Sequence, residues 1–203
     1  PDYWPEHLQV LGYHERKKTN NWKASPELEA FLQKHAKIVF ITFGSMVNSD
    51  PIAKTQIILE VLERNSIPAI INTASGGLVK PEKYNKDLIH FVGNIPYDWV
   101  FPKMYAVMHH GGSGTTHTAL KYRCASLIIP HIIDQYVWNR INFRVGTGPM
   151  GMDISKVKQK NLESVLLELI NNPTYKAKAE ALGAQMQNED FRKELCDSIT
   201  RAV

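Results

Sequence analysis

Short apolar runs alternate along this chain with longer segments in which apolar residues recur at helical spacing. The run "KIVFITFGS" at 37–45 is rich in β-branched and aromatic residues and stops at Gly44, which is typical of a buried parallel strand. In the next segment Asp50 suits an N-cap and Pro51 the first helical position. The pattern predicts strands at 37–45, 67–74, 88–93, 105–110 and 125–130, with a weaker one near 148–153. It predicts helices within 50–66, 113–122, 135–145, 155–170, 173–186 and 190–202.

Strands that alternate with helices predict a parallel sheet covered on both faces, the Rossmann-like, doubly wound α/β class. Ligands of such folds bind outside the carboxyl ends of the strands. Three glycine- or hydroxyl-rich turns stand at those ends: "FGSMVNS" at 43–49, "NTASGG" at 72–77 and "HHGGSGTT" at 109–116. Their convergence is the first indication of a binding site.

Composition narrows the class of protein. The chain has 203 residues, 43% of them hydrophobic, which fits one globular domain. The net charge of +4 comes from scattered lysines, so we expect no nucleic-acid partner. Two cysteines without paired spacing argue against a disulfide framework or a cysteine zinc site. No apolar run is long enough to span a membrane and no signal peptide opens the chain, so a cytoplasmic location is expected.

The histidines of the third turn suggest a metal site, which their placement does not favour. His109 and His110 are adjacent on a predicted strand, so their side chains point to opposite faces. His117 lies on the following helix without an acidic partner at ligand spacing. We therefore expect no metal.

Two further motifs match known catalytic or nucleotide-binding patterns but lack the structural context that those patterns require. "GGSGT" resembles a nucleophile elbow around Ser113, but Thr115 replaces its last glycine and no histidine follows the acid Asp134, as a hydrolase of this kind requires. "GTGPMG" at 146–151 matches the dinucleotide pattern, yet it follows a helix and contains Pro149. We interpret it as a turn.

An anion cradle fits the third turn better. A strand ends at His110, and glycines let the backbone bend and approach a ligand closely. A helix beginning near Ser113 presents unpaired N–H groups and the positive end of its dipole, where phosphate binds readily. The hydroxyls of Ser113, Thr115 and Thr116 would add donors. The alternative is a helix merely capped by Ser113, with the glycines serving close packing.

The stretch "GNIPYDWVFPKMYAVMHHGGSGTTHTALKYRCASLIIPHIIDQYVWNRI" at 93–141 resembles the donor-binding signature of UDP-sugar glycosyltransferases of the GT-B fold. The likeness is to the sterol 3-β-glucosyltransferase branch and its bacterial relatives, and it extends to "FGSM" at 43–46 and "GTGP" at 146–149. The resemblance implies an interdomain connector and leading helix at 1–36, and a nucleotide-sugar-binding domain at 37–203. It also implies that this is the C-terminal half of the enzyme, with the acceptor domain and catalytic base outside these residues.

The resemblance implies roles for matching positions. The diphosphate would be held by His110, by the turn of Gly112, Ser113, Gly114 and Thr115, and by Gly44 and Ser45, and the uracil would meet the backbone near Ile95. Asp134 and Gln135 would bind the sugar hydroxyls, with an N-cap as the alternative role for Asp134. Thr118 stands where plant relatives carry a ribose-binding glutamate, so ribose recognition stays unassigned.

The expected reaction is transfer of a hexose, with a lean toward glucose, from a UDP-sugar to a hydroxyl of a lipid or sterol-like acceptor. The UDP-sugar is a co-substrate, and no cofactor is expected. The positive charge would suit docking at an anionic membrane surface. Two alternatives remain open: a subunit of a two-chain UDP-N-acetylglucosamine transferase, and a non-catalytic nucleotide-sugar-binding module.

Overall fold

The computed structural model describes residues 4–5, 7–14, 22–73 and 76–200. Much of the predicted connector, residues 74–75 of the second turn and the end of the last predicted helix lie outside these ranges. Within them the chain forms a five-stranded parallel sheet in the order β3-β2-β1-β4-β5. The strands are β1 (Val39–Thr42), β2 (Ala69–Asn72), β3 (Ile89–Val92), β4 (Ala106–His109) and β5 (Ala125–Ile128). The predicted doubly wound α/β class is confirmed.

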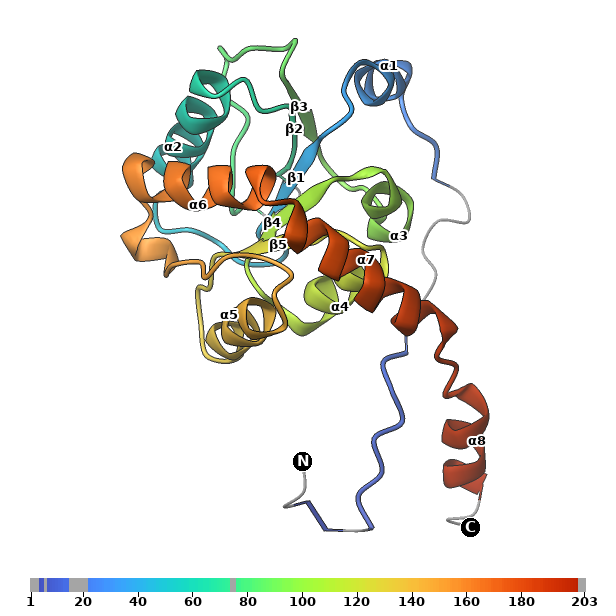
Figure 1. Ribbon diagram of the computed structural model, residues 1–203. Helices are drawn as coiled ribbons and strands as arrows, with labels where there is room; N and C mark the ends of the chain where they lie inside the picture. The colour runs from blue at the N-terminus through green and yellow to red at the C-terminus, as the bar shows by residue number, and fades with distance from the viewer. Residues whose placement is uncertain (1–3, 6, 15–21, 74–75, 201–203) are drawn as a thin grey trace.

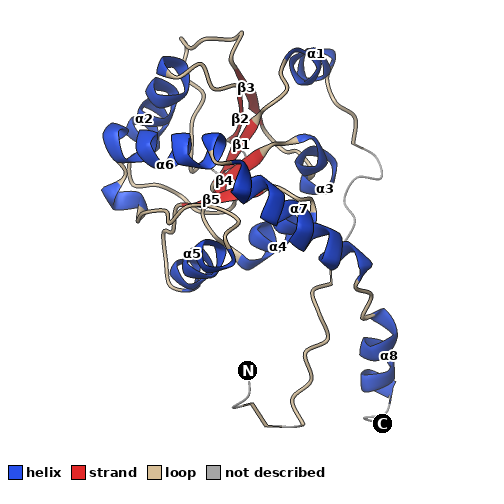
Figure 2. Cartoon of the chain, in the orientation of Figure 1, coloured by secondary structure: helices blue, strands red, loops and turns tan. Residues whose placement is uncertain are grey.

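Helices cover both faces of this sheet, as Figure 2 shows with the strands in red between the helices. The α-helices are α1 (Pro26–Lys34), α2 (Pro51–Arg64), α3 (Tyr97–Val100), α4 (Ser113–Lys121), α5 (Asp134–Val145), α6 (Gln159–Asn171), α7 (Pro173–Asn188) and α8 (Arg192–Thr200). Two short 3-10 turns are η1 (Phe101–Lys103) and η2 (Ile154–Lys156). Helix α2 begins as predicted, with the Asp50 carboxylate accepting a bond of 2.9 Å from the Ala53 N–H and with Pro51 in the first turn.

Alternate residues of each strand enter two separate cores, because successive side chains of a strand point to opposite faces. On β1, Val39 and Ile41 pack with α2 and α6, whereas Phe40 packs with α1, the short α3–η1 segment and α4. All four residues of β1 are buried. The long apolar runs in the sequence are therefore the mark of a central strand covered on both sides.

The chain leaves β1 toward β2 on one side and reaches β4 on the other, so a topological switch point lies between β1 and β4. Thr42 and His109 are paired in register at the carboxyl ends of these two strands. The first and third glycine turns of the sequence therefore leave the sheet side by side (Figure 1). The sheet places them at the edge where such folds bind ligands.

The weak strand predicted near 148–153 is wrong. This segment runs along the outer edge of β5 without forming a ladder. Asn139 of α5 holds it by exchanging two bonds with Gly151 at 3.0 Å each, while Asn142 of α5 donates to the Ser126 carbonyl of β5 at 2.8 Å. A Cβ at Gly148 or Gly151 would lie 1.7 Å from a carbonyl oxygen of β5. The glycines of "GTGPMG" thus permit a close approach, and their interpretation as a turn is confirmed.

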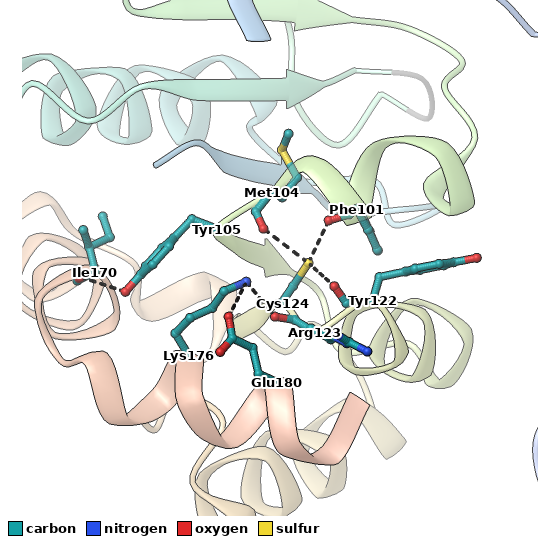
Figure 3. Close-up of polar contacts among 9 residues, drawn as sticks. All are labelled: Phe101, Met104, Tyr105, Tyr122, Arg123, Cys124, Ile170, Lys176 and Glu180. Atoms are coloured by element: carbon teal, nitrogen blue, oxygen red, sulfur yellow. Dashed lines mark hydrogen bonds and ion pairs between the residues drawn. The ribbon is translucent and has the colours of Figure 1, made fainter. Parts of the chain in front are cut away.

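Helix α7 is hydrogen-bonded to the amino-terminal edge of the sheet, opposite the edge at which the glycine turns leave it (Figure 3). The Lys176 ammonium donates to the Arg123 carbonyl at 2.8 Å and lies 3.9 Å from a carboxylate oxygen of Glu180. Beside it the buried Cys124 thiol donates to the Phe101 carbonyl at 3.2 Å. Burial raises the pKa of Cys124 to about 12, so this thiol is a packing group.

The first described residues and α8 extend together away from the sheet (Figure 1). The Ser198 hydroxyl and the Gln9 amide oxygen are 3.1 Å apart, and a Cβ on Gly12 would overlap the ring of Phe191. Within the described part of the chain no helix has the length and apolar character needed to cross a bilayer. The domain division at residue 36 stays a prediction.

Candidate functional site at the carboxyl edge of the sheet

The amino end of α4 has no side-chain cap. Its N-cap residue is Gly112, with extended backbone dihedrals of −61° and 140°, and this residue supplies no side-chain cap bond to the first turn. The alternative of a helix capped by Ser113 is therefore wrong. The first N–H groups and the positive end of the helix dipole face the ligand edge, as an anion site requires.

The ring of His110 fills a slot between two glycines. A Cβ on Gly44 would lie 2.6 Å from the His110 Cε1, and a Cβ on Gly112 would lie 2.4 Å from the Nε2. Gly44 also has a φ of +56°, in the left-handed region of backbone conformation that favours glycine. Both glycines are therefore required for the imidazole to lie beside the amino end of α4.

The electrostatics of His110 favour a neutral imidazole. Burial lowers its pKa to about 4; the nearby His131 acts in the same direction, while the charge of Asp134 opposes it. Among the described residues its buried Nδ1 has no hydrogen-bond partner. The His109 Nδ1 accepts a bond of 3.1 Å from the Gly111 N–H, and burial lowers the pKa of His109 to about 3.

The hydroxyls of the turn divide into two groups. Thr116 is buried and donates to the Gly112 carbonyl at 3.0 Å, so its expected role as an additional donor to a ligand is wrong. Ser113 and Thr115 are half-buried at the start of α4, where their side chains remain accessible. Ser45 is exposed on the loop that follows β1.

A chain of hydrogen bonds ties the segment of Ile95 to the end of β1. The hydroxyls of Tyr97 and Thr42 are 2.8 Å apart, and the Gly44 N–H donates to the Thr42 hydroxyl at 3.2 Å. Ile95 itself is buried in the core, so only its backbone could meet a ligand. The nearby Trp22 indole donates to the Asn94 carbonyl at 3.2 Å.

Asp134 and Gln135 begin α5 but differ in environment. Asp134 is the first residue of the helix, and the N-cap is Ile133, so the capping role considered for Asp134 is wrong; its carboxylate is exposed. Gln135 is buried, and its side-chain oxygen accepts bonds from the backbone N–H groups of His131 at 2.7 Å and Ile132 at 3.2 Å. That oxygen is engaged within the loop, which leaves the Gln135 amide group as its possible contact with a sugar.

Sequence reasoning missed two residues of this edge, Asn48 and His131. The His131 Nε2 lies 3.1 Å from the Asn48 Oδ1, and the Asn48 amide donates in a short bond to the Gly77 carbonyl. These contacts join the loops after β1, β2 and β5. The one available signal was that His131 is the first polar residue after a buried strand; nothing in the sequence indicated Asn48 as its partner.

The described residues contain no cluster of three or more histidine, cysteine or acidic side chains able to hold a metal ion. The predicted diphosphate residues lie on two neighbouring loops, those after β1 and β4, while Ile95 is linked to them through Tyr97 and Thr42. The roles of individual residues toward a ligand stay predictions.

A family model described as "Erythromycin biosynthesis protein CIII-like, C-terminal domain" matches residues 81–201, which is more than half of the chain. The chain belongs to this family. The match covers β3 to α8 and includes the turn of His110 and the start of α5.

Curated relatives include sterol 3-beta-glucosyltransferases, which confirms the resemblance drawn from the motifs. The chain is 34% identical over 190 residues to the sterol 3-beta-glucosyltransferase UGT80A2 of Arabidopsis thaliana, covering 94% of this chain and 30% of that protein. It is 30% identical over 197 residues to the sterol 3-beta-glucosyltransferase of Komagataella phaffii, covering 92% of this chain and 16% of the relative. The chain thus spans about a third or less of the length of these relatives.

Solved structures share the fold. One described as the glycotransferase of kitacinnamycin superposes with a TM-score of 0.73 at 15% identity, over 94% of this chain and 47% of the other. The spinosyn forosaminyltransferase SpnP superposes with a TM-score of 0.71 at 14% identity, over 85% of this chain and 46% of the other. With the sheet order, these likenesses confirm the predicted Rossmann-like fold of the GT-B class.

Proposed function

We propose that this chain binds the diphosphate of a UDP-hexose at the amino end of α4, as the donor domain of an enzyme that glucosylates a sterol-like lipid. The observation that carries the proposal is the uncapped start of α4 with the His110 imidazole held against it between Gly44 and Gly112. Oriented N–H groups and an imidazole at one point are suited to a diphosphate. The names of the relatives favour glucose as the sugar and a sterol as the acceptor.

The chemistry expected at this point is charge stabilisation. When the sugar leaves a nucleotide diphosphate, negative charge develops on the β-phosphate. Donors placed there in advance stabilise the transition state more than the ground state. In this proposal the Asp134 carboxylate accepts bonds from sugar hydroxyls and the Gln135 amide donates to them. The UDP-sugar is the co-substrate, and a lipid acceptor would bring the enzyme to a membrane surface.

Calorimetry with UDP and UDP-glucose on the protein at its natural length tests the assignment. His110→Ala should weaken the binding of both ligands by at least about 1 kcal/mol, the scale of a lost charge-assisted hydrogen bond. Asp134→Ala should weaken UDP-glucose but leave UDP unchanged, because UDP has no sugar hydroxyls for the carboxylate to bind. His35→Ala, at the C-cap of α1, is the matched control and should change neither affinity.

Unchanged UDP affinity in a folded His110→Ala variant would show that the diphosphate does not bind at the amino end of α4. Equal weakening of UDP and UDP-glucose binding by Asp134→Ala would show that the Asp134 carboxylate does not bind the sugar. Transfer of labelled glucose from UDP-glucose to a sterol separates the enzyme from a non-catalytic binding module, which would bind the donor and leave the sterol unmodified.

A further inference from the structure

His131 makes contacts that a neutral imidazole cannot satisfy together. Its Nδ1 lies 2.9 Å from the carbonyl oxygen of Ile129, and its Nε2 lies 3.1 Å from the side-chain oxygen of Asn48. A backbone carbonyl can only accept. A neutral imidazole carries one N–H and so makes one of these two bonds; an imidazolium makes both.

The orientation of the Asn48 amide decides the second contact. Its nitrogen donates to the Gly77 carbonyl, which also can only accept. Turning the amide over would place two oxygens against each other at that point. The Asn48 oxygen is therefore directed at His131, and both acceptors of the ring belong to buried residues, Asn48 and Ile129.

The charges around His131 come from four elements. Lys54 of α2 lowers its pKa and Asp153, before η2, raises it, but burial is the largest influence and lowers the pKa of His131 overall. His110, after β4, is close enough for an imidazolium at His131 to lower its pKa, and Asp134 of α5 raises the pKa of His110. Without a ligand, the ring is therefore neutral near pH 7 and one of its two bonds is unmade.

The loop that contains His131 also leads into the proposed sugar site. Ile133 has a φ of +24°, a strained value for a β-branched residue, and it directly precedes Asp134. Such strain persists where surrounding contacts hold the backbone. The contacts of this loop include the two bonds to the Gln135 oxygen and the ring of His131, which lies within hydrogen-bond distance of Ile129 and Asn48.

We propose that His131 is a positioning residue of the donor site, which takes up one proton from solvent when the diphosphate binds and then bonds both Ile129 and Asn48. The inference rests on the proposed function, since the negative charge of the diphosphate is what favours the imidazolium. The added bond fastens the loop after β5 to the loop after β1. It thereby fixes Asp134 relative to Gly44 and His110.

Calorimetric titration with UDP-glucose tests this proton uptake. UDP-glucose is the suitable probe because the terminal phosphate of UDP titrates near pH 6 and would release or bind protons of its own. The binding enthalpy is measured at pH 6.5 in buffers of different ionisation enthalpy, and its slope gives the protons taken up. The expected result for the wild-type protein is a net uptake of protons on binding.

Three variants identify the group that takes up the proton. His131→Gln can still donate to Asn48 but cannot titrate, so uptake should disappear while binding persists more weakly. Asn48→Ala removes the oxygen that accepts the second bond of the imidazolium, so uptake should also fall. His35→Gln, at the C-cap of α1 where the ring meets the Asp87 carbonyl, should leave uptake at the wild-type value.

Each outcome decides the matter. Uptake that persists in His131→Gln and vanishes in His110→Gln would assign the proton to His110 and overturn the proposal. Binding without uptake in the wild-type protein would overturn it while leaving the proposed function intact. Failure of the wild-type protein to bind UDP-glucose would overturn the proposed function, and this inference with it. A merely structural His131 would weaken binding on substitution without changing the proton count.

Discussion

Substitution of Gly112 by alanine should weaken the binding of a diphosphate at the amino end of α4 while leaving the fold intact. The backbone dihedrals of Gly112, −61° and 140°, suit alanine, so no backbone strain arises. Its Cβ, however, would lie 2.4 Å from the His110 Nε2, whereas ordinary contact begins at 3.4 Å. The ring must therefore move by about 1 Å, and Gly44 blocks its other side. A shift of that size breaks a hydrogen bond.

The loss follows from the value of that bond. A hydrogen bond to a charged group contributes about 1.5–3 kcal/mol, so the dissociation constant for UDP should rise about 10- to 100-fold. Alanine is a poorer N-cap than glycine, which should cost the fold about 1 kcal/mol or less. Calorimetry measures the affinity, and urea unfolding measures the stability.

A double-mutant cycle isolates the mechanism. If Gly112→Ala acts by displacing the ring, it should cost little further affinity in a His110→Ala background. Equal losses in both backgrounds would refute the reasoning, because the alanine would then be acting on the backbone N–H groups or on the ligand itself.

Two further predictions concern stability. Gly183→Ala should lower the free energy of unfolding, measured in urea, by about 1–2 kcal/mol. Its Cβ would lie 2.5 Å from the Leu120 carbonyl oxygen and force α4 and α7 apart, which should outweigh the gain in helix propensity. Gly93→Ala is the control and should be neutral, because no atom lies within 4 Å of its Cβ. The pKa of His109 is about 3 when folded against an ordinary value of 6.5, so the unfolded state binds more protons between these values, and stability should fall as pH drops through this window, by up to about 1.4 kcal/mol per pH unit. His109→Asn should show a flatter decline between pH 7 and 5, and an equal decline would show that His109 does not titrate on unfolding.

Most of the fold could be predicted because its signals are local. The apolar runs of 37–45 and 105–110 each contain a fully buried strand, and Asp50 with Pro51 begins α2 as predicted. The helix predicted at 155–170 instead divides into η2 and α6. The Asp153 side chain caps the 3-10 turn by accepting from the Ser155 N–H, a local competition that apolar spacing does not reveal.

The site was predictable where a single turn builds it. Gly112 and His110 are neighbours in sequence, so strand, bend and helix start could be seen together in the sequence. The pairing of Asn48 with His131 joins residues 83 positions apart and depends on the strand order, which places their loops side by side. The role of the Gln135 side-chain oxygen as an acceptor within the loop also could not be predicted. The sequence does not show that the N–H groups of His131 and Ile132 need an acceptor.

The two histidines of this edge explain how a basic site can be stable without its ligand. Burial keeps His110 neutral, with a pKa of about 4, and also lowers the pKa of His131, so the free protein does not hold two adjacent imidazolium ions. A diphosphate in the proposed seat would reverse that balance, since its charge favours the protonated form of whichever ring it approaches. The site would then gain positive charge as it binds. The same slot that excludes water from His110 would make that charge most effective on the leaving phosphate.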